Sequence, residues 1–188
     1  MSESKTFKLT YATMFDPPPD LHTYFDEQLE QMKENLGHEH PMLINGQNRF
    51  TDDKFESRSP INTDWVLGTF QKGGQKDVDD AVAAAHASFP SWSRLRWHER
   101  VTLLREVASQ IEARLFELGV ALSLDVGKNR MEALGDAQET ADLIRHACDI
   151  LEANDGFIVQ MQSDPLKGFM SSNTSCLKPY GPWVVISP

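Results

Sequence analysis

Cys148 and Cys176 are the first residues to weigh for chemistry, because a cysteine thiolate can act as a nucleophile or bind a metal. The two lie far apart, no C-x-x-C pair occurs, and neither has a Gly-rich segment or a candidate base beside it. Cys148 falls on the apolar face of a predicted helix and Cys176 in a predicted strand, so both are interpreted as packing residues. Their spacing gives no disulfide framework and suits a reducing compartment, which predicts a cytoplasmic protein.

Glu139 is the most informative acidic residue. It lies off the apolar stripe set by Ala137 and Ala141, and Glu132 and Asp136 are nearby on the same predicted helix. An acidic helix face is a solvated surface in most proteins. The residues alone therefore place Glu139 on the surface.

The remaining chemical candidates are weak. His38 and His40 could bind a metal, but no third ligand follows at helical spacing and no His-Glu-x-x-His occurs. Lys128 stands in a predicted turn near a helix end, where a surface cation is ordinary. We therefore predict a solvated histidine pair and no metal site, and we assign Lys128 no chemistry.

The composition, with 188 residues of which 40% are hydrophobic and 24% charged, is that of a soluble globular protein. No segment approaches the roughly 18 apolar residues of a membrane helix, and the N-terminus lacks the apolar stretch of a secretion signal. The 18 Lys and Arg form no dense block within a formal charge of −10. The sequence therefore predicts neither a membrane nor a nucleic acid as partner.

The elements that must position these residues begin with an arm over residues 1–40. Pro17-Pro18-Pro19 breaks the chain, and Asp20 can cap a helix that runs to about Leu36 and ends at Gly37, with one apolar face to dock. Short β segments follow at 42–44, 55–58 and 65–70, with turn residues such as Asn45-Gly46 between them. These predict small antiparallel hairpins.

Three helices are predicted from Asp77 to about Asn154. Asp77 can cap the first, and Pro90 rules out a continuous helix there. Apolar residues at three-to-four spacing mark the second helix: Val101, Leu104, Ala108, Ile111, Leu115 and Leu118. The third follows a left-handed cap at Gly127 and carries Leu134, Ala137, Ala141, Ile144, Cys148 and Leu151.

Extended segments close the chain. Two of them, 157–161 and about 174–178, are predicted to form a hairpin around a loop with Pro165 and Gly168. The last, Trp183-Val184-Val185-Ile186, is apolar on both alternating faces, which is typical of a strand in a parallel sheet covered by helices on both sides. No such helices follow, so we expect that the chain is cut within a larger domain.

Four motifs, in this order and spacing, resemble the aldehyde dehydrogenase superfamily over residues 41–188. They are Leu43-Ile44-Asn45-Gly46, Ser59-Pro60-Ile61-Asn62 followed by Val66-Leu67-Gly68, Phe89-Pro90-Ser91-Trp92, and Val126-Gly127-Lys128. Within the family, Gly127-Lys128-Asn129 followed by Glu132-Ala133 and Glu139, together with the long arm, is similar to the branch that oxidises glutamate semialdehyde.

The resemblance implies an α/β fold, of which this chain holds the N-terminal part. It divides the chain into the arm (1–40), the hairpins and helices of the NAD-binding domain (41–156), an oligomerisation hairpin (157–180) and the first strand of a Rossmann-like sheet (181–188). A second copy would bind through the hairpin, giving a homo-oligomer.

The resemblance also implies the chemistry. A cysteine thiolate attacks the aldehyde and a glutamate activates water, and both would lie beyond Pro188, so we expect no catalytic residue and no activity in this chain alone. The substrate would be a small aldehyde and the cofactor NAD, with NADP also open. Glu139 would border the substrate channel, and Ile186, Ser187 and Pro188 would line the cofactor cleft. The alternatives are another substrate branch of the family, or a non-enzymatic interaction module that binds a partner through its acidic helices and edge hairpin.

Overall fold

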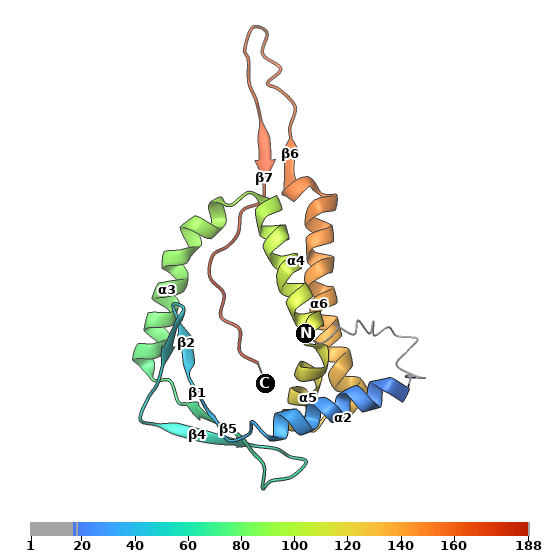
Figure 1. Cartoon of the computed structure of the whole chain (residues 1–188). Helices are drawn as coiled ribbons and strands as arrows, with labels where there is room; N and C mark the ends of the chain where they lie inside the picture. Colours follow the sequence, from blue (N-terminus) through green and yellow to red (C-terminus); the bar gives the residue numbers. More distant parts are fainter. Residues whose placement is uncertain (1–16, 18, 188) are drawn as a thin grey trace.

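The computed structural model describes residue 17 and residues 19–187, and it mixes helices with short strands as predicted (Figure 1). The helices are α2 (Pro19–Lys33), α3 (Gln75–Arg94), α4 (Trp97–Ala113), α5 (Leu115–Val126), α6 (Arg130–Ala153) and the 3₁₀ turn η1 (Asp155–Phe157). The strands are β1 (Glu39–His40), β2 (Met42–Ile44), β3 (Gln47–Arg49), β4 (Lys54–Arg58), β5 (Val66–Gln71), β6 (Ile158–Gln160) and β7 (Thr174–Cys176).

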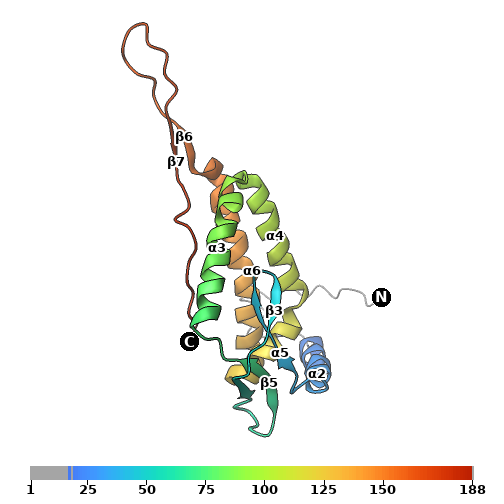
Figure 2. The ribbon, with the colours of Figure 1, turned by 90° about the vertical axis from the view of Figure 1, so that its left-hand side faces the viewer.

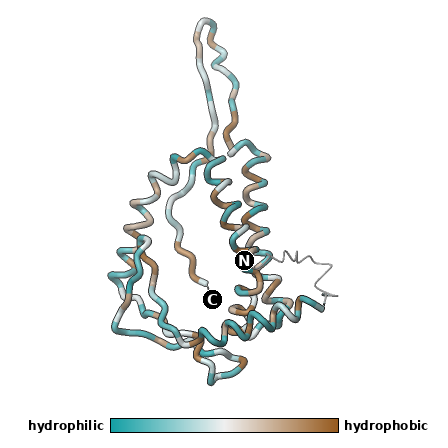
Figure 3. Tube along the Cα trace, in the orientation of Figure 1, coloured by the Kyte–Doolittle hydropathy of each residue, from teal (hydrophilic) through white to brown (hydrophobic). Residues whose placement is uncertain are grey.

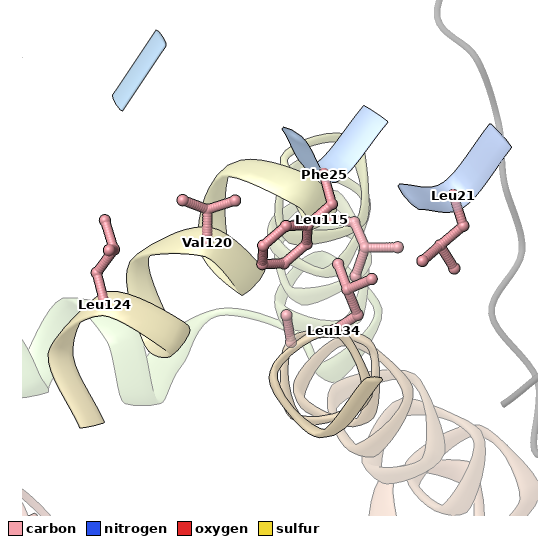
Figure 4. Close-up of a cluster of buried hydrophobic side chains, with 7 residues drawn as sticks. Leu21, Phe25, Leu115, Val120, Leu124 and Leu134 are labelled. Atoms are coloured by element: carbon pink, nitrogen blue, oxygen red, sulfur yellow. The ribbon is translucent and has the colours of Figure 1, made fainter. Parts of the chain in front are cut away.

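Helix α2 docks on the helical body, which confirms the apolar face predicted for the arm. Leu21 and Phe25 are buried in one cluster with residues of α5 and α6 (Figure 4): Leu115, Val120, Leu124, Leu134 and Ala137. Arg130 of α6 pairs with Asp26 at 2.6 Å and lies over the Phe25 ring. The helix ends at Lys33 and not at Leu36. The side-chain amide of Asn35 donates a hydrogen bond to the Gln31 carbonyl at 2.9 Å and so competes with the backbone hydrogen bond that would continue the helix.

The predicted hairpins form around the predicted turns. Strands β2 and β3 pair antiparallel through Asn45 and Gly46, whose φ of 53° and 71° are those of a two-residue hairpin turn. Strands β4 and β5 also pair antiparallel, and β1 adds to β5 in parallel. Strand β1 lies in the segment that the sequence analysis interpreted as arm. It was not predicted, because a two-residue strand that pairs with a distant segment leaves no local pattern.

Helix α3 runs through Pro90, so the prediction that this proline prevents a continuous helix is wrong. Proline removes one helical hydrogen bond, to the carbonyl of His86, and His86 is exposed, so water can bind that oxygen. The cap is also placed differently. Asp77 is the third residue of the helix, and its carboxylate accepts the backbone N–H of Gly74 at 2.9 Å.

The predicted second helix is divided in two at Arg114, so the region has four helices and not three. The backbone of Arg114 leaves the helical range, with φ −106° and ψ 22°, and this break directs Leu115 into the core, where it is 3% exposed. Gly127 adopts the predicted left-handed cap, with φ 74°, and the Asn129 side chain accepts the N–H of Glu132. Helix α6 then packs along both α4 and α5.

The side of the molecule that carries α3 is open. None of the side chains of α3 is buried, and the apolar residues Val78 and Val82 are 56% and 41% exposed. The run 181–187 passes between α3 and the α4–α6 pair in Figure 1, and Figure 2 shows it at one edge of the molecule. The tube of Figure 3 is coloured hydrophobic toward the end of this run.

The predicted strand at Trp183–Ile186 does not form in this chain. None of the described strands lies beside the run, so its backbone has no partner for a ladder of hydrogen bonds. Trp183 and Ile186 are 77% and 89% exposed. By contrast, the extended segments predicted at 157–161 and about 174–178 do pair, since β6 and β7 run antiparallel at the base of a hairpin that projects away from the body (Figure 1).

Candidate functional site

Glu139 lies on an exposed stripe of α6 that sequence analysis did not recognise. Residues 139, 143, 146 and 150 recur at helical spacing on one side of the helix, and all four are exposed. The stripe begins with Glu139 and continues with Leu143, which is 60% exposed, His146, and Ile150, which is 42% exposed. Glu139 therefore shares its exposed side of α6 with two apolar residues, which an acidic solvated face alone would not predict.

The acidic neighbours of Glu139 have other tasks. Asp136 pairs with Lys128, which thereby ties the α5–α6 turn to α6. Glu132 lies in the first turn of α6, where its backbone N–H donates to Asn129 and its negative charge complements the helix dipole. This leaves Glu139 as the acidic residue of the stripe for which the structure shows no structural task.

Apolar residues are also exposed on α3 and α4, the helices between which the run 181–187 passes in Figure 1. On α4, Leu103 and Val107 are 50% and 45% exposed, and α3 contributes Val78 and Val82. Single exposed apolar residues are ordinary, but three helices with such residues and an exposed apolar run indicate a surface that another part of a protein covers.

The predicted cofactor residues lie apart from Glu139. Ile186 and Ser187 are exposed on the unpaired run, and Pro188 lies outside the described residues. Among the described residues, no hydrogen bond or ion pair joins the run to Glu139. A dinucleotide is held by a Gly-rich turn and a helix N-terminus directly after such a strand. Residues 181–187 supply neither, so they could form one wall of a nucleotide cleft but could not hold the nucleotide.

The cysteines have the surroundings predicted for them. Cys148 is 1% exposed on the face of α6 that packs on α4, with its Sγ 3.9 Å from the carbonyl oxygen of Val101. Cys176 is half-buried in β7. Among the contacts of the described residues neither thiol has a base beside it, so neither is set up as an activated nucleophile.

The histidine pair is exposed, but it is not simply solvated as predicted. The His40 ring stacks on Phe70 with 4.9 Å between centroids, and it fills the space beside Gly68. Among the described residues there is no group of three His, Cys, Asp or Glu that could hold a metal ion. Nor is any helix in that part of the chain long and apolar enough to span a membrane.

A shallow groove of about 360 Å³ lies on α4 beside the end of α6. Its charged lining residues include Arg105 and Glu152, which pair with each other at 2.5 Å. The groove contains none of the predicted site residues. It is therefore not the site that Glu139 and the C-terminal run predict.

Comparison with known proteins decides what this open-sided arrangement belongs to. Residues 48–188 match the aldehyde dehydrogenase family. The chain belongs to this family. The predicted family and fold are thus confirmed, and the open side of this aldehyde dehydrogenase region is the side that carries the apolar run.

Individual relatives and solved structures show what the chain is similar to. The 1-pyrroline-5-carboxylate dehydrogenase of Staphylococcus saprophyticus is 36% identical over 166 residues, which are 87% of this chain and 31% of the relative. Among solved structures, the 1-pyrroline-5-carboxylate dehydrogenase from Thermus with bound NAD has a TM-score of 0.74 at 24% identity, covering 87% of this chain and 31% of that one. An NAD-dependent aldehyde dehydrogenase from Sinorhizobium meliloti has a TM-score of 0.60 at 31% identity, covering 65% and 25%.

Two facts follow from these coverages. The chain spans about a third of the length of the relatives it matches. In addition, a match over 87% of the chain cannot be contained in residues 48–188, which make up three quarters of it. The similarity to the Staphylococcus enzyme therefore extends into the segment before residue 48, where β1 and α2 lie.

Proposed function

We propose that the protein carrying this chain is an NAD-dependent aldehyde dehydrogenase that oxidises L-glutamate 5-semialdehyde, the open form of 1-pyrroline-5-carboxylate, to L-glutamate in proline catabolism. The observation that carries the proposal is the similarity to 1-pyrroline-5-carboxylate dehydrogenases beyond the family's common region, into the segment of β1 and α2. This segment is built into the fold, because Leu21 and Phe25 of α2 are buried in the main core. The cytoplasm remains the proposed location, supported by two cysteines that form no disulfide.

In this proposal the chain supplies walls and contacts, and the covalent chemistry is supplied by residues outside it. Glu139 borders the substrate channel, supported by its exposed position on α6 one turn before the exposed Leu143. Ile186, Ser187 and Pro188 line the cofactor cleft, supported by the exposure of the run that carries the first two. The nucleotide, when bound, accepts a hydride from the substrate. NADP in its place stays open.

The hairpin is the proposed contact with a second copy of the chain. Its projecting residues are apolar and exposed, notably Leu166, Phe169 and Met170, of which Met170 is 99% exposed. The outer edges of β6 and β7 carry unpaired backbone groups, which can pair with a strand of another subunit. Homo-oligomerisation through residues 157–180 is therefore part of the proposal.

Steady-state kinetics test the substrate. The full-length protein should reduce NAD with glutamate semialdehyde at a kcat/KM well above that for propanal or hexanal, whereas residues 1–188 alone should give no turnover. Efficient oxidation of the simple aldehydes with no activity on glutamate semialdehyde would reject the branch and keep the family. Turnover by residues 1–188 alone would reject the assignment of catalysis to residues outside this chain.

A second candidate is an aldehyde dehydrogenase with a different aldehyde substrate. The Sinorhizobium meliloti structure favours it, because that protein is named only as an NAD-dependent aldehyde dehydrogenase and is similar over 65% of this chain. The same kinetic comparison distinguishes the two candidates. A non-enzymatic interaction module is less well supported, since it does not account for the family match of residues 48–188.

A further inference from the structure

The start of α4, the end of α6 and the base of the hairpin meet at Trp97 and Gly156. After α6 ends at Ala153, three consecutive residues, 155–157, form a left-handed turn with φ of 47°, 67° and 55°. Residues with side chains rarely adopt this conformation, and a run of three turns the chain sharply from the helix into β6. The direction of the hairpin is therefore set within this short turn.

The indole of Trp97 occupies the position that a side chain at residue 156 would need. A Cβ placed on Gly156 would lie 2.6 Å from Nε1 of Trp97 and closer still to Cγ and Cδ1. Real Cβ atoms do not approach other heavy atoms so closely, so the ring and the turn fit only because this residue is glycine. Trp97 thus packs directly on the backbone of the turn.

Trp97 is itself held in place by contacts between α4 and α6. Trp97, Val101 and Arg105 follow one another at four-residue spacing along one face of α4. One and two turns further along α4, Cys148 contacts the Val101 carbonyl, and Arg105 pairs with Asp149 at 2.6 Å and Glu152 at 2.5 Å. The helix that carries Trp97 is therefore fixed to the end of the helix that carries the turn.

Both strands of the hairpin are attached to the same turn. The backbone N–H of Phe157 donates to the Asn154 carbonyl at 2.9 Å, and the returning strand is tied by the N–H of Leu177, which donates to the Phe157 carbonyl at 3.2 Å. Beyond this point the hairpin strands of the described chain pack chiefly on each other. Any change in the turn therefore swings the whole hairpin.

We propose that Trp97 and Gly156 form a rigid joint that sets the angle at which the hairpin leaves the helical body, and so the position in which it meets a second copy of the chain. The second part rests on the proposed homo-oligomer. The first part depends only on the packing of the turn. An experiment can therefore separate the two.

Distances between spin labels in the full-length protein test the joint. Labels at Lys167→Cys on the hairpin and Gln110→Cys on α4 report the hairpin angle. The background carries Cys176→Ser and serine in place of the reactive cysteines outside residues 1–188. Gly156→Ala should shift the distance distribution and Trp97→Ala should broaden it. If the alanine acts by displacing the indole, Gly156→Ala should add no further shift in the Trp97→Ala background.

Gly46→Ala is the matched control. Gly46 has a φ of 71°, close to the 67° of Gly156, but nothing lies within 4 Å of its Cβ position. It carries the same backbone strain without the clash, far along the chain from the hairpin. The label distances should be unchanged in this variant, and a shift as large as that of Gly156→Ala would assign the effect to backbone strain and overturn the joint.

Sedimentation of the same variants tests the assembly. Gly156→Ala should raise the dissociation constant of the oligomer at least tenfold, while Gly46→Ala should leave it within about threefold. A changed hairpin angle with an unchanged dissociation constant would support the joint and reject the hairpin as subunit contact. Unchanged label distances in both Gly156→Ala and Trp97→Ala would overturn the joint, and if Gly156→Ala does not fold, Trp97→Ala alone decides it by the same measurements.

Discussion

Helices α2 and α3 lie on different sides of the same body, and they differ in what covers their apolar faces. Helix α2 has 15 residues and buries Leu21 and Phe25 almost completely. Helix α3 has 20 residues and buries none, although Val78 and Val82 lie on one face. Similar amphipathic sequences therefore end in different environments. Helices α5 and α6 receive the apolar face of α2, whereas among the described residues α3 is held mainly by the β2–β3 hairpin and its apolar face stays exposed.

The open side also carries the run 181–187, whose apolar residues are exposed like those of α3. Helix α3 and the run 181–187 therefore both expose apolar side chains that other residues would need to cover. The Staphylococcus relative, of which the chain spans 31%, has the additional residues from which such cover could come. The comparison predicts that substitutions on the closed side change folding, whereas substitutions on the open side change function or association.

The largest expected effect is on the closed side. Leu134→Ala should lower the free energy of unfolding by about 3 kcal/mol, because it removes a fully buried side chain that packs against Gly119 of α5. Leu143→Ala, on the same helix but 60% exposed, should change it by less than about 0.5 kcal/mol. Urea unfolding of the chain measures both, and equal losses would show that the open stripe of α6 is packed in solution.

The next effect concerns the function of the open side. Glu139→Gln in the full-length protein should lower kcat/KM for glutamate semialdehyde about tenfold, the equivalent of one charge-assisted hydrogen bond, without changing the thermal unfolding temperature. Glu27→Gln is the control, since Glu27 is also exposed but lies on α2. If both variants keep full activity, Glu139 is a solvated surface residue, as its sequence alone predicted.

The sequence predicted features that depend on one residue or a short segment, and it did not predict features that depend on partners distant in the sequence. Asn45-Gly46 and Gly127 were identified because a positive φ is a property of the residue itself. The break at Arg114 was missed because it depends on a core on which Leu115 packs, and apolar spacing continues across it. Strand β1 was missed because its partner β5 follows some thirty residues later.

The candidate site was predicted in the same uneven way. Family resemblance pointed to Glu139, but its exposed stripe with Leu143 and Ile150 could have been found from spacing alone. The strand at Trp183–Ile186 was predicted from its apolar pattern. An apolar pattern indicates that a segment can form a buried strand, but not whether a neighbouring strand is present to pair with it. In this chain the run is unpaired.

A smaller effect is expected where α3 is anchored. Arg49 of β3 pairs with Asp77 at 3.0 Å and Asp80 at 2.7 Å. The backbone N–H of Gly74, then Arg49, hold the pKa of Asp77 below its usual 3.8, and Lys76, then Arg49, do the same for Asp80. A lowered pKa in the folded state means that ionisation favours folding, so this stabilisation is complete above the usual pKa and lost as pH falls through the lowered one.

Arg49→Ala tests this anchor. At pH 7 the variant should unfold at lower urea than the parent, and the difference should shrink as the pH is taken below 3.8, where the carboxylates of the parent become protonated. Arg94→Ala, exposed near the end of the same helix, should leave the unfolding curve unchanged at both pH values. A difference that stays constant from pH 7 to pH 2 would show that Arg49 acts by packing and not by its charge.

The smallest effect on folding is expected on the apolar run, and it separates the two sides most clearly. Val185 is 88% exposed, so Val185→Asp in the chain of residues 1–188 should change the free energy of unfolding by less than about 0.5 kcal/mol. The same substitution should reduce self-association in light scattering, because it places a charge in an exposed extended segment that could pair with other chains.

In the full-length protein Val185→Asp should instead be strongly destabilising, since a charge would be buried if other residues cover the run. Equal unfolding curves for the full-length parent and variant would show that the run stays exposed there too, and the open side would then be a real surface of the protein.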